Sequence, residues 1–456
     1  MLVVGAGLSG LHCAYRLKQM GVTPLLFEAQ KAAGGRVVTD RTTFPDGLHC
    51  EVGAELIDSV HKTMMSLATE LGIDLYDYNT LASPSGKPYI SELDFFGGKA
   101  LTNSDLATAW KPVAAKVNAA LAMLTNPDAS CTYLNPNGGQ ALDAMSIAQW
   151  LDQSGLTGTI RTMLEVAYVT EYGVETDVSS ALNLVQFIDP ANYDTNPGSD
   201  ERFTTKTGNA TFIEKLVEKV SPDNITYNAK LVRIVKNADG RYTASFDVGG
   251  GSTRDVIAEH VVISLPFSVL RDVDLSGIAL PSLKMRAINE IGYGQNSKLM
   301  AGFSARFWNT AGYDGTTITD AGFQEAWDTS RLQPGTSGIL TNYTGGNTGI
   351  AIGNGTPESQ LTTFLASLEK VYPGATAQSN GKVVRGAWPT NPFVKGSYAC
   401  YKVNQATTFG GIERERWQNV HFCGEHTNKT FQGFMEGAVV SGQRVATEIL
   451  KDLGLV

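Results

Sequence analysis

Residues 2–10 read Leu-Val-Val-Gly-Ala-Gly-Leu-Ser-Gly, and the apolar segment 24–27 ends on an acid, Glu28. Residues 2–4 predict a strand, the amphipathic segment after Gly10 predicts a helix, and 24–27 predicts a second strand. Glu28 follows Gly10 by 18 residues, close to the spacing at which a carboxylate binds a ribose in dinucleotide-binding βαβ units. This stretch therefore predicts a Rossmann-like fold.

Each of the three glycines in this turn has a separate physical role. Gly5 permits the tight turn, Gly7 lets the backbone approach a pyrophosphate, and Gly10 lets helix and strand pack closely. The N-terminus of the helix then offers free N–H groups and the positive end of its dipole to that phosphate. The pattern predicts a dinucleotide site, and a purely structural glycine-rich turn is the alternative.

A second glycine pair, Gly34-Gly35, stands directly before Arg36 and shortly after Glu28. An arginine at such a turn can clamp a phosphate oxygen through charge-assisted hydrogen bonds. Because the second strand of an NAD enzyme normally leads on without this feature, the pattern favours FAD. The alternative is a glycine-rich loop with a solvated arginine.

Composition excludes several classes of protein. The 456 residues are 42% hydrophobic and 18% charged, which is typical of a globular protein of two to three domains. The net charge of −9 argues against nucleic-acid binding, and no apolar run is long enough for a membrane span. The five scattered cysteines predict neither a disulfide framework nor a metal site.

These features predict a soluble, cytoplasmic protein without a signal peptide. Only four residues precede Gly5, fewer than a strand before such a turn usually has. We therefore expect residues upstream of Met1, and export stays open.

The rest of the chain predicts a second domain woven into the first. We expect helices at 104–124, 146–154 and 158–168, a loop at 189–200, strands at 226–235 and 242–246 joined by a hairpin turn, a buried parallel strand at 260–265, short strands with glycine-rich turns over 285–390, and a strand at 420–423 before a helix from Met435. The predicted fold class is α/β and α+β. A Rossmann-like FAD-binding domain (1–75, 207–273 and 396–456) is interleaved with a substrate-binding domain of mixed sheet plus helices (76–206 and 274–395).

Motifs in a fixed order run along nearly the whole chain. They are the Gly5 turn with Glu28, Gly34-Gly35-Arg36, Glu51-Val52-Gly53-Ala54-Glu55, Leu231, Ser264-Leu265-Pro266, Lys298, Trp388 with Gly396-Ser397-Tyr398, and the segment 424–437. Together they resemble the flavin-containing amine oxidase family, which includes monoamine, polyamine and L-amino acid oxidases. The resemblance implies FAD as cofactor, bound by Gly5, Gly7, Leu8, Ser9, Gly10, Glu28, Ala29, Gly34, Gly35, Arg36, Gly53, Ala54, Glu55, Leu231, Gly424, Glu425, Gly433, Phe434 and Met435.

Four residues receive catalytic roles from this resemblance. Lys298 is implied to hold a water at the flavin N5, although an isolated lysine is usually a solvated charge. Tyr398 and Phe434 are implied to form an aromatic slot that aligns the substrate amine, with ordinary core aromatics as the alternative. Trp388 is implied to lie near the flavin ring, and the alternative is an ordinary tryptophan buried in the hydrophobic core.

Departures from the family pattern carry further expectations. Ser397 stands where mitochondrial monoamine oxidases have the cysteine that bonds the flavin, so FAD is expected to be non-covalent. The membrane anchor of those enzymes is missing from 451–456. The arginine with which snake-venom L-amino acid oxidases bind the substrate carboxylate is missing after Gly53, and Arg161 or Arg202 could replace it.

One charged feature bears on the substrate. Glu165, Glu171, Glu175 and Asp177 concentrate acid in one region, which could steer cationic amines into an entrance. A solvated helix face is the alternative.

The resemblance implies an oxidase that moves hydride from the carbon next to an amine nitrogen to flavin N5. The imine is hydrolysed to an aldehyde or ketone, and dioxygen is reduced to hydrogen peroxide. The alternatives are an L-amino acid oxidase, a flavin-dependent tailoring oxidase or dehydrogenase of a secondary metabolite, and a non-catalytic flavoprotein interaction module. Expected partners are a small amine or amino acid and dioxygen, with no nucleic acid and no membrane, and a homodimer is left open.

Overall fold

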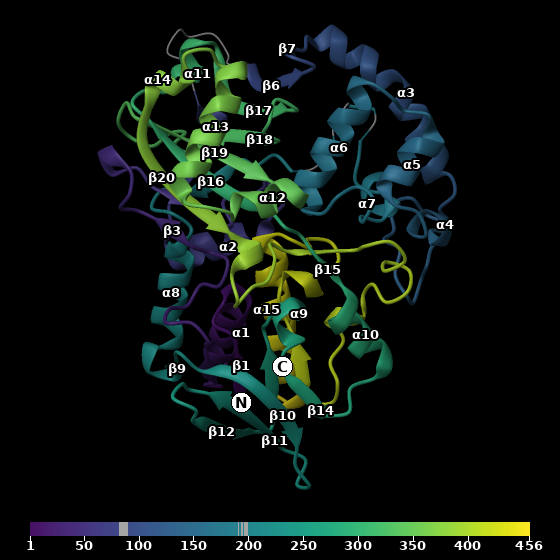
Figure 1. Ribbon diagram of the computed structural model, residues 1–456. Helices are drawn as coiled ribbons and strands as arrows, with labels where there is room; N and C mark the ends of the chain where they lie inside the picture. The colour runs from purple at the N-terminus through teal and green to yellow at the C-terminus, as the bar shows by residue number, and fades with distance from the viewer. Residues whose placement is uncertain (82–89, 190, 193–194, 196–198) are drawn as a thin grey trace.

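A five-stranded parallel sheet carries the N-terminal glycine turn (Figure 1). The computed structural model describes residues 1–81, 90–189, 191–192, 195 and 199–456. All neighbours in the sheet are parallel, and the order is β22 (Val420–Phe422), β13 (Val261–Ile263), β1 (Leu2–Val4), β2 (Leu25–Phe27) and β9 (Ile225–Thr226). The strands predicted at 2–4, 24–27, 260–265 and 420–423 are therefore confirmed, and they meet in one sheet.

Helices α1 (Leu8–Gln19) and α15 (Met435–Asp452) pack against each other beside this sheet. A Cβ at Gly442 of α15 would come within 2.5 Å of the Ser9 carbonyl oxygen of α1. Helices α2 (Lys62–Leu71) and α8 (Ala210–Val220) complete this apolar core. Both α1 and α15 begin at the same end of the sheet, so their N-termini come close to one region.

A four-stranded sheet extends the same part of the molecule, with the order β12 (Thr253–Ala258), β11 (Tyr242–Asp247), β10 (Lys230–Lys236) and β14 (Asp274–Gly277). The predicted hairpin between β10 and β11 is confirmed. The single strand expected at 226–235 is wrong, because the chain turns at 227–229 and β9 and β10 join different sheets. Asn228 adopts a left-handed backbone (φ +53°), which ends one strand before the next begins.

A seven-stranded sheet forms the opposite part of the molecule (Figure 1). Its order is β20 (Ser379–Ala387), β16 (Ser297–Phe303), β19 (Gly338–Thr344), β18 (Glu325–Asp328), β17 (Tyr313–Thr319), β6 (Ile90–Phe96) and β7 (Lys99–Ala100). Only the β6–β17 pairing is parallel. The expectation of strands and turns alone over 285–390 is wrong, since α13 (Pro357–Val371) also lies there. Thr356 caps this helix, which buries Leu361, Phe364 and Leu368 on one face.

Helices α3 (Asn103–Leu121), α5 (Ile147–Ser154) and α6 (Thr159–Tyr172) confirm the three helices predicted before the loop. Half of the loop expected at 189–200, namely 190, 193–194 and 196–198, lies outside the described residues. Shorter elements are α4 (Gln140–Asp143), α7 (Ala181–Val185), α9 (Phe267–Leu270), α10 (Ser282–Glu290), α11 (Phe307–Thr310), α12 (Gly346–Ile352), α14 (Ala375–Gln378), and the strand pairs β3 (Thr39–Asp40) with β4 (Cys50–Glu51), β5 (Leu75–Asp77) with β8 (Phe203–Thr205), and β15 (Gly292–Tyr293) with β21 (Ala399–Cys400). No helix in the described part of the chain is both long and apolar enough to cross a bilayer. All five cysteines are buried free thiols.

Candidate active site

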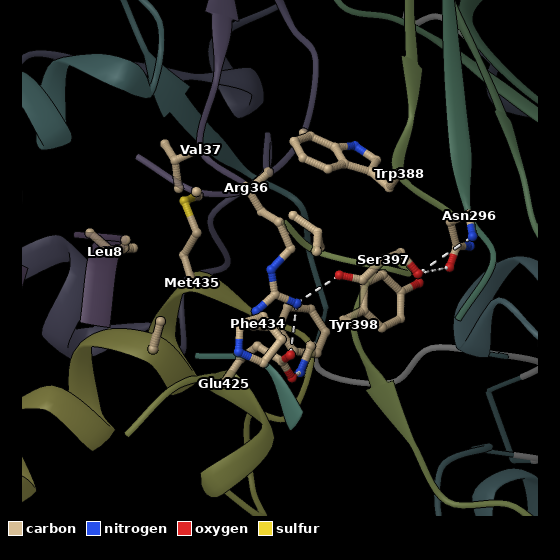
Figure 2. Close-up of a pocket in the computed structure, with 18 of the residues that line it drawn as sticks. Leu8, Arg36, Val37, Asn296, Trp388, Ser397, Tyr398, Glu425, Phe434 and Met435 are labelled. Atoms are coloured by element: carbon tan, nitrogen blue, oxygen red, sulfur yellow. Dashed lines mark hydrogen bonds and ion pairs between the residues drawn. The ribbon is translucent and has the colours of Figure 1, made fainter. Parts of the chain in front are cut away.

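A cavity of about 480 Å³ is lined both by the carboxyl ends of β1 and β2 and by strands of the seven-stranded sheet. Every cofactor or catalytic residue predicted from the sequence lines this cavity, except Gly10. Figure 2 shows Leu8 and Met435 on one side of it and Trp388 and Tyr398 on the other. The structure thus brings together residues that are spread from position 5 to position 435.

The glycine turn forms one end of the cavity. Gly5 has φ +98°, a conformation in which a side chain would be strained. A Cβ at Gly10 would lie 2.1 Å from the Gly5 carbonyl oxygen, so Gly10 packs beneath the turn instead of lining the cavity. Around Gly7, by contrast, a Cβ would meet no protein atom within 4 Å. Gly7 therefore leaves space at the N-terminus of α1, where an anion is favoured.

Glu28 is buried at the end of β2 and is held by backbone groups. Its Oε2 accepts a hydrogen bond from Ala6 N at 2.8 Å, and its Oε1 accepts one from Gln30 N at 2.9 Å. Burial raises the pKa of Glu28, while these backbone donors oppose the rise. Each oxygen keeps a lone pair for a further donor, which suits the hydroxyls of a ribose.

Arg36 sits in the middle of the cavity wall and makes two contacts through one nitrogen. Its Nη1 donates to Glu425 Oε1 at 2.8 Å and to the Ser397 carbonyl oxygen at 2.6 Å, as Figure 2 shows. Among the described residues, no hydrogen bond uses Nε or Nη2 of Arg36. The arginine is thus fixed by Glu425 while part of its guanidinium remains available to a phosphate. Glu425 Oε2 also accepts from Gly433 N at 2.9 Å, which fixes the turn before α15.

Lys298 on β16 forms a buried ion pair with Glu55. Its Nζ lies 2.7 Å from Glu55 Oε2, and both side chains are less than 8% exposed (7% and 3%). Glu55 Oε1 accepts hydrogen bonds from Trp327 Nε1 at 3.0 Å and from Thr329 Oγ1. Burial alone would raise the pKa of Glu55, but Lys298 and these donors hold it below its usual value. The pair places a fixed cation on the cavity wall.

Tyr398 and Phe434 flank the turn at Gly433, where a Cβ would meet the Tyr398 ring at 3.3 Å. The Tyr398 hydroxyl donates to the Glu171 carbonyl oxygen at 2.6 Å and shares a 2.7 Å hydrogen bond with the Tyr343 hydroxyl. These contacts hold the ring in one orientation. Both aromatic side chains therefore meet the cavity as predicted, although no sequence signal pointed to Tyr343.

Trp388 closes another side of the cavity. Its Nε1 donates to the Val52 carbonyl oxygen at 3.0 Å, and its ring lies so close to Gly53 that a Cβ there would approach within 2.8 Å. Gly53 is further confined by the Arg36 carbonyl oxygen, at 2.0 Å from the same Cβ position. Only glycine fits at this point of the wall.

The structure also brings four carboxylates into the cavity, of which the sequence had pointed only to Glu171. Glu92 of β6, Glu171 of α6, Glu201 before β8 and Glu325 of β18 all line it; we call these four the acidic end. Burial, together with Glu201 and Asp58, raises the pKa of Glu171 to about 8. Burial also raises the pKa of Glu201 to about 7, against the opposing effect of Arg331.

Glu325 shows most directly that these groups act on one another. Burial raises its pKa far above the usual value, and Glu201, Glu92 and Glu171 add to the rise. Such mutual repulsion makes the acidic end a place where a cation is favoured. Of the four acids 165–177 noted in the sequence, Glu171 alone is among the residues that line the cavity.

The two arginines offered as carboxylate ligands are bound elsewhere. Arg161 pairs with Asp152 and Glu165, while Arg202 pairs with Asp77. Neither is among the described residues that line the cavity. An amino acid carboxylate would therefore lack both of these partners.

The residues present fit a flavin dinucleotide. The glycine turn and two helix N-termini suit a pyrophosphate, Glu28 suits a ribose, and Trp388 and Tyr398 offer flat apolar walls to a ring. Buried polar atoms along the same cavity, namely Ser297 Oγ and both ring nitrogens of His426, have no partner among the described residues. A bound polar molecule would satisfy them.

Comparison with known proteins agrees with this geometry. The family model for flavin-containing amine oxidoreductases matches residues 8–450. An L-amino-acid oxidase of Siganus canaliculatus is 26% identical over 481 residues, covering 99% of this chain and 85% of its own length. The structure of cyclohexylamine oxidase from Brevibacterium oxydans IH-35A superposes with a TM-score of 0.84 at 22% identity and covers 99% of both chains. Putrescine oxidase bound to putrescine superposes with a TM-score of 0.83 at 20% identity, covering 99% of this chain and 98% of its own. Because the family model spans almost the whole chain, this protein belongs to the flavin-containing amine oxidoreductases.

Proposed function

We propose that this oxidoreductase acts on amines that carry a second cationic group, such as linear diamines, and that it is an oxidase. The reaction converts the amine R–CH2–NH2, dioxygen and water into an aldehyde, ammonia and hydrogen peroxide. FAD, held by the glycine turn, Glu28 and Arg36, would supply the hydride acceptor and the route of the electrons to dioxygen. The observation that carries the choice of substrate is the acidic end of the cavity.

Tyr398, Phe434 and Trp388 are proposed to orient the reacting amine. Their rings exclude water and align the C–H bond of the carbon next to nitrogen. The reacting nitrogen is neutral when hydride leaves, so no carboxylate has to face it. Lys298, fixed by Glu55, is proposed to hold a water near the reacting centre.

A second ammonium group gives the acidic end its role. The other three acids raise the pKa of Glu325, so a nearby cation would favour its ionised form, whereas a substrate carboxylate would raise its pKa further. This favours a diamine over a monoamine and over an amino acid. The likeness to an L-amino-acid oxidase keeps the amino acid as the second candidate.

Three compounds separate these candidates in a peroxide-release assay. Ornithine and 1,4-diaminobutane differ by a carboxylate, and 1,4-diaminobutane and butylamine differ by the second nitrogen. We expect kcat/KM to be at least about tenfold higher for the diamine than for butylamine, which corresponds to about 1.4 kcal/mol. Faster turnover of ornithine would instead support the amino acid oxidase. If no compound in a broad panel of amines and amino acids yields peroxide, the oxidase assignment is wrong.

Glu325→Gln tests the acidic end within the same assay. It is expected to lower kcat/KM for the diamine and to leave butylamine within about twofold, because only the diamine has a charge to place there. Glu165→Gln is the matched control on α6, since Glu165 pairs with Arg161 outside the cavity. Equal losses for both amines would contradict the proposed role.

We further propose that FAD is bound without a covalent link. Ser397 Oγ donates to Asn296 Oδ1 at 2.6 Å, and a serine offers no thiol for attachment. Acid precipitation should release all flavin into the supernatant, and flavin in the pellet would contradict the proposal. A homodimer and a cytoplasmic location stay predictions, which light scattering and cell fractionation can check.

The domain boundaries are a proposal of the same kind. The five-stranded and four-stranded sheets draw their strands from 1–75, 207–273 and 396–456, except for β14 at the boundary. The seven-stranded sheet draws its strands from 76–206 and 274–395. This supports a cofactor-binding domain and a substrate-binding domain that are each discontinuous in sequence.

A further inference from the structure

Two buried histidines meet near the amino ends of strands β13 and β22, away from the carboxyl ends that border the cavity. His260 directly precedes β13, and His421 lies in the neighbouring strand β22. His260 Nδ1 and His421 Nε2 are 3.3 Å apart, and the two residues are 6% and 0% exposed. The two residues are 161 positions apart in sequence, so no spacing motif announces them.

A carboxylate completes a group of three possible metal ligands. Asp452, at the end of α15, is exposed, and one of its carboxylate oxygens lies within 4.8 Å of one ring nitrogen of each histidine. Arg416 contacts Asp452 through Oδ2. Among the described residues, no hydrogen bond uses Oδ1, which is therefore available to a metal.

The orientation of His421 is already set by a second carboxylate. Its Nδ1 lies 3.1 Å from Glu448 Oε2, one turn before Asp452 on α15. With the proton on Nδ1, the lone pair of Nε2 points toward His260 Nδ1. Metal-binding histidines are commonly held in this way by a carboxylate on the opposite nitrogen.

The separation of the two nitrogens fits a tetrahedral ion. For Zn–N bonds of about 2.0–2.1 Å, the edge of a tetrahedron is about 3.3–3.4 Å. The observed 3.3 Å matches this edge, while it is long for a direct hydrogen bond. The exposed side of Asp452 gives a metal access from solvent and room for a water as fourth ligand.

We propose that His260, His421 and Asp452 bind a zinc ion that fastens the end of α15 to the sheet, with Glu448 as a positioning residue. The site lies toward the amino ends of β13 and β22, whereas residues that follow their carboxyl ends line the cavity. The proposed role of the zinc ion is therefore structural. It is independent of the proposed oxidase activity. Since α15 begins at the cavity, which Met435 lines, and ends at this site, zinc would fix the far end of a helix that borders the cavity.

The test is a zinc titration of the chelator-treated protein, produced without a polyhistidine tag. We expect one zinc per chain by elemental analysis, a Kd of micromolar or tighter by calorimetry, and a melting temperature that rises with zinc concentration. The double variant His260→Gln/His421→Gln should lose at least about 100-fold in affinity, and Glu448→Gln about 10- to 100-fold. His49→Gln, a buried histidine away from the site, is the matched control and should bind zinc as the wild type does.

Two further measurements keep the proposal testable if the double variant fails to fold. Asp452→Asn changes an exposed residue and should weaken zinc binding without lowering the melting temperature of the metal-free protein. Cobalt bound to the wild type should give the intense visible absorption of a tetrahedral site. Zinc binding that is no tighter in the wild type than in Asp452→Asn, or a cobalt spectrum that matches the hydrated ion, would overturn the proposal.

Discussion

The two ends of the cavity are built in different ways. At the cofactor end, backbone atoms form the wall of the cavity. Glycines, helix N-termini and carbonyl groups shape it around Gly5, Gly7 and Gly53. At the acidic end, side chains form the wall, and Glu92, Glu171, Glu201 and Glu325 come from four separate segments of the chain. A wall made of backbone leaves a local signature in the sequence, whereas a wall made of side chains depends on how distant elements pack.

The largest effect should come from adding one methyl group to the cofactor end. Gly10→Ala places a Cβ 2.1 Å from the Gly5 carbonyl oxygen, which is backbone and has little freedom to move. We expect the variant to lose most of its flavin, measured by the ratio of flavin to protein absorbance, and to melt several degrees lower.

Gly7→Ala is the matched control for this change. The residue has φ −75°, and its Cβ would meet no protein atom within 4 Å. Its melting temperature without flavin should stay near that of the wild type, while its affinity for FAD falls because the new methyl group occupies the space left for the cofactor. Equal destabilisation of both variants would show that the two glycines do not have separate roles.

A second prediction concerns the charge pair between the two ends. Lys298→Met leaves the carboxylate of Glu55 buried without its cation, which typically costs about 3–5 kcal/mol. We expect a loss of this size in urea unfolding, with FAD still bound and its reoxidation by dioxygen slowed in stopped-flow measurements. An unchanged reoxidation rate would show that Lys298 does not serve the reacting centre.

Two further variants separate the charge from the packing. The double variant Lys298→Met/Glu55→Gln should recover part of the lost stability, because no buried charge is left alone. Lys395→Met removes an exposed pair with Asp272 and should cost no more than about 1 kcal/mol. A loss as large in Lys395→Met as in Lys298→Met would mean that burial of the pair is not what matters.

The smallest effect should be a pH dependence of substrate preference. The pKa of Glu201 is raised to about 7 and that of Glu171 to about 8, so the acidic end gains negative charge as the pH rises from 6 to 9. The preference for the diamine over butylamine, taken as the quotient of their two kcat/KM values, should therefore rise by up to about tenfold over this range. The quotient largely removes the titration of the reacting amine that both substrates share, and a flat quotient would contradict the assignment.

The same groups predict how stability changes with pH. A carboxyl whose pKa is raised from 4.5 on folding binds more protons in the folded state than in the unfolded state. Folding stability without substrate should therefore fall as the pH rises from about 4.5 to 8. A diamine should offset part of this loss, which thermal melting with and without the ligand can measure.

Much of the cofactor end could be predicted from the sequence. The turn at Gly5, the carboxylate Glu28 and the arginine Arg36 follow one another within 32 residues, where local spacing carries the information. Lys298 and Tyr398 were found only through their resemblance to a family, since a lone lysine or tyrosine has no local signature. Their contacts with Glu55 and Tyr343 could not be predicted, because Glu55 and Tyr398 lie outside the seven-stranded sheet and meet Lys298 and Tyr343 on it only through the packing of segments distant in sequence.

The acidic end shows what limits sequence reasoning. Glu325 and Glu92 stand on strands β18 and β6, with β17 between them in the sheet, yet they are 233 positions apart in the chain. Glu171 was noted for its charge, but its neighbours Glu165 and Glu175 do not line the cavity, since the helix and the turn after it direct them elsewhere. Helix α13 was not predicted, although Thr356 and the apolar residues of one face indicate a helix in the sequence. The glycine-rich turns around this segment favoured the interpretation as strands and turns.

Glu171 connects the aromatic residue Tyr398 with the acidic end of the cavity. Its carbonyl oxygen accepts the hydroxyl of Tyr398, while its side chain faces the acidic end. Any change that shifts α6 must therefore move the ring that aligns the reacting carbon together with the group that attracts the distant charge. Glu325 stands on β18, yet its side chain is hydrogen-bonded by Thr170 of the same helix, whose carbonyl oxygen also accepts from Tyr398. Selectivity for the length of the substrate and turnover should therefore change together in evolution, as one trait carried by α6.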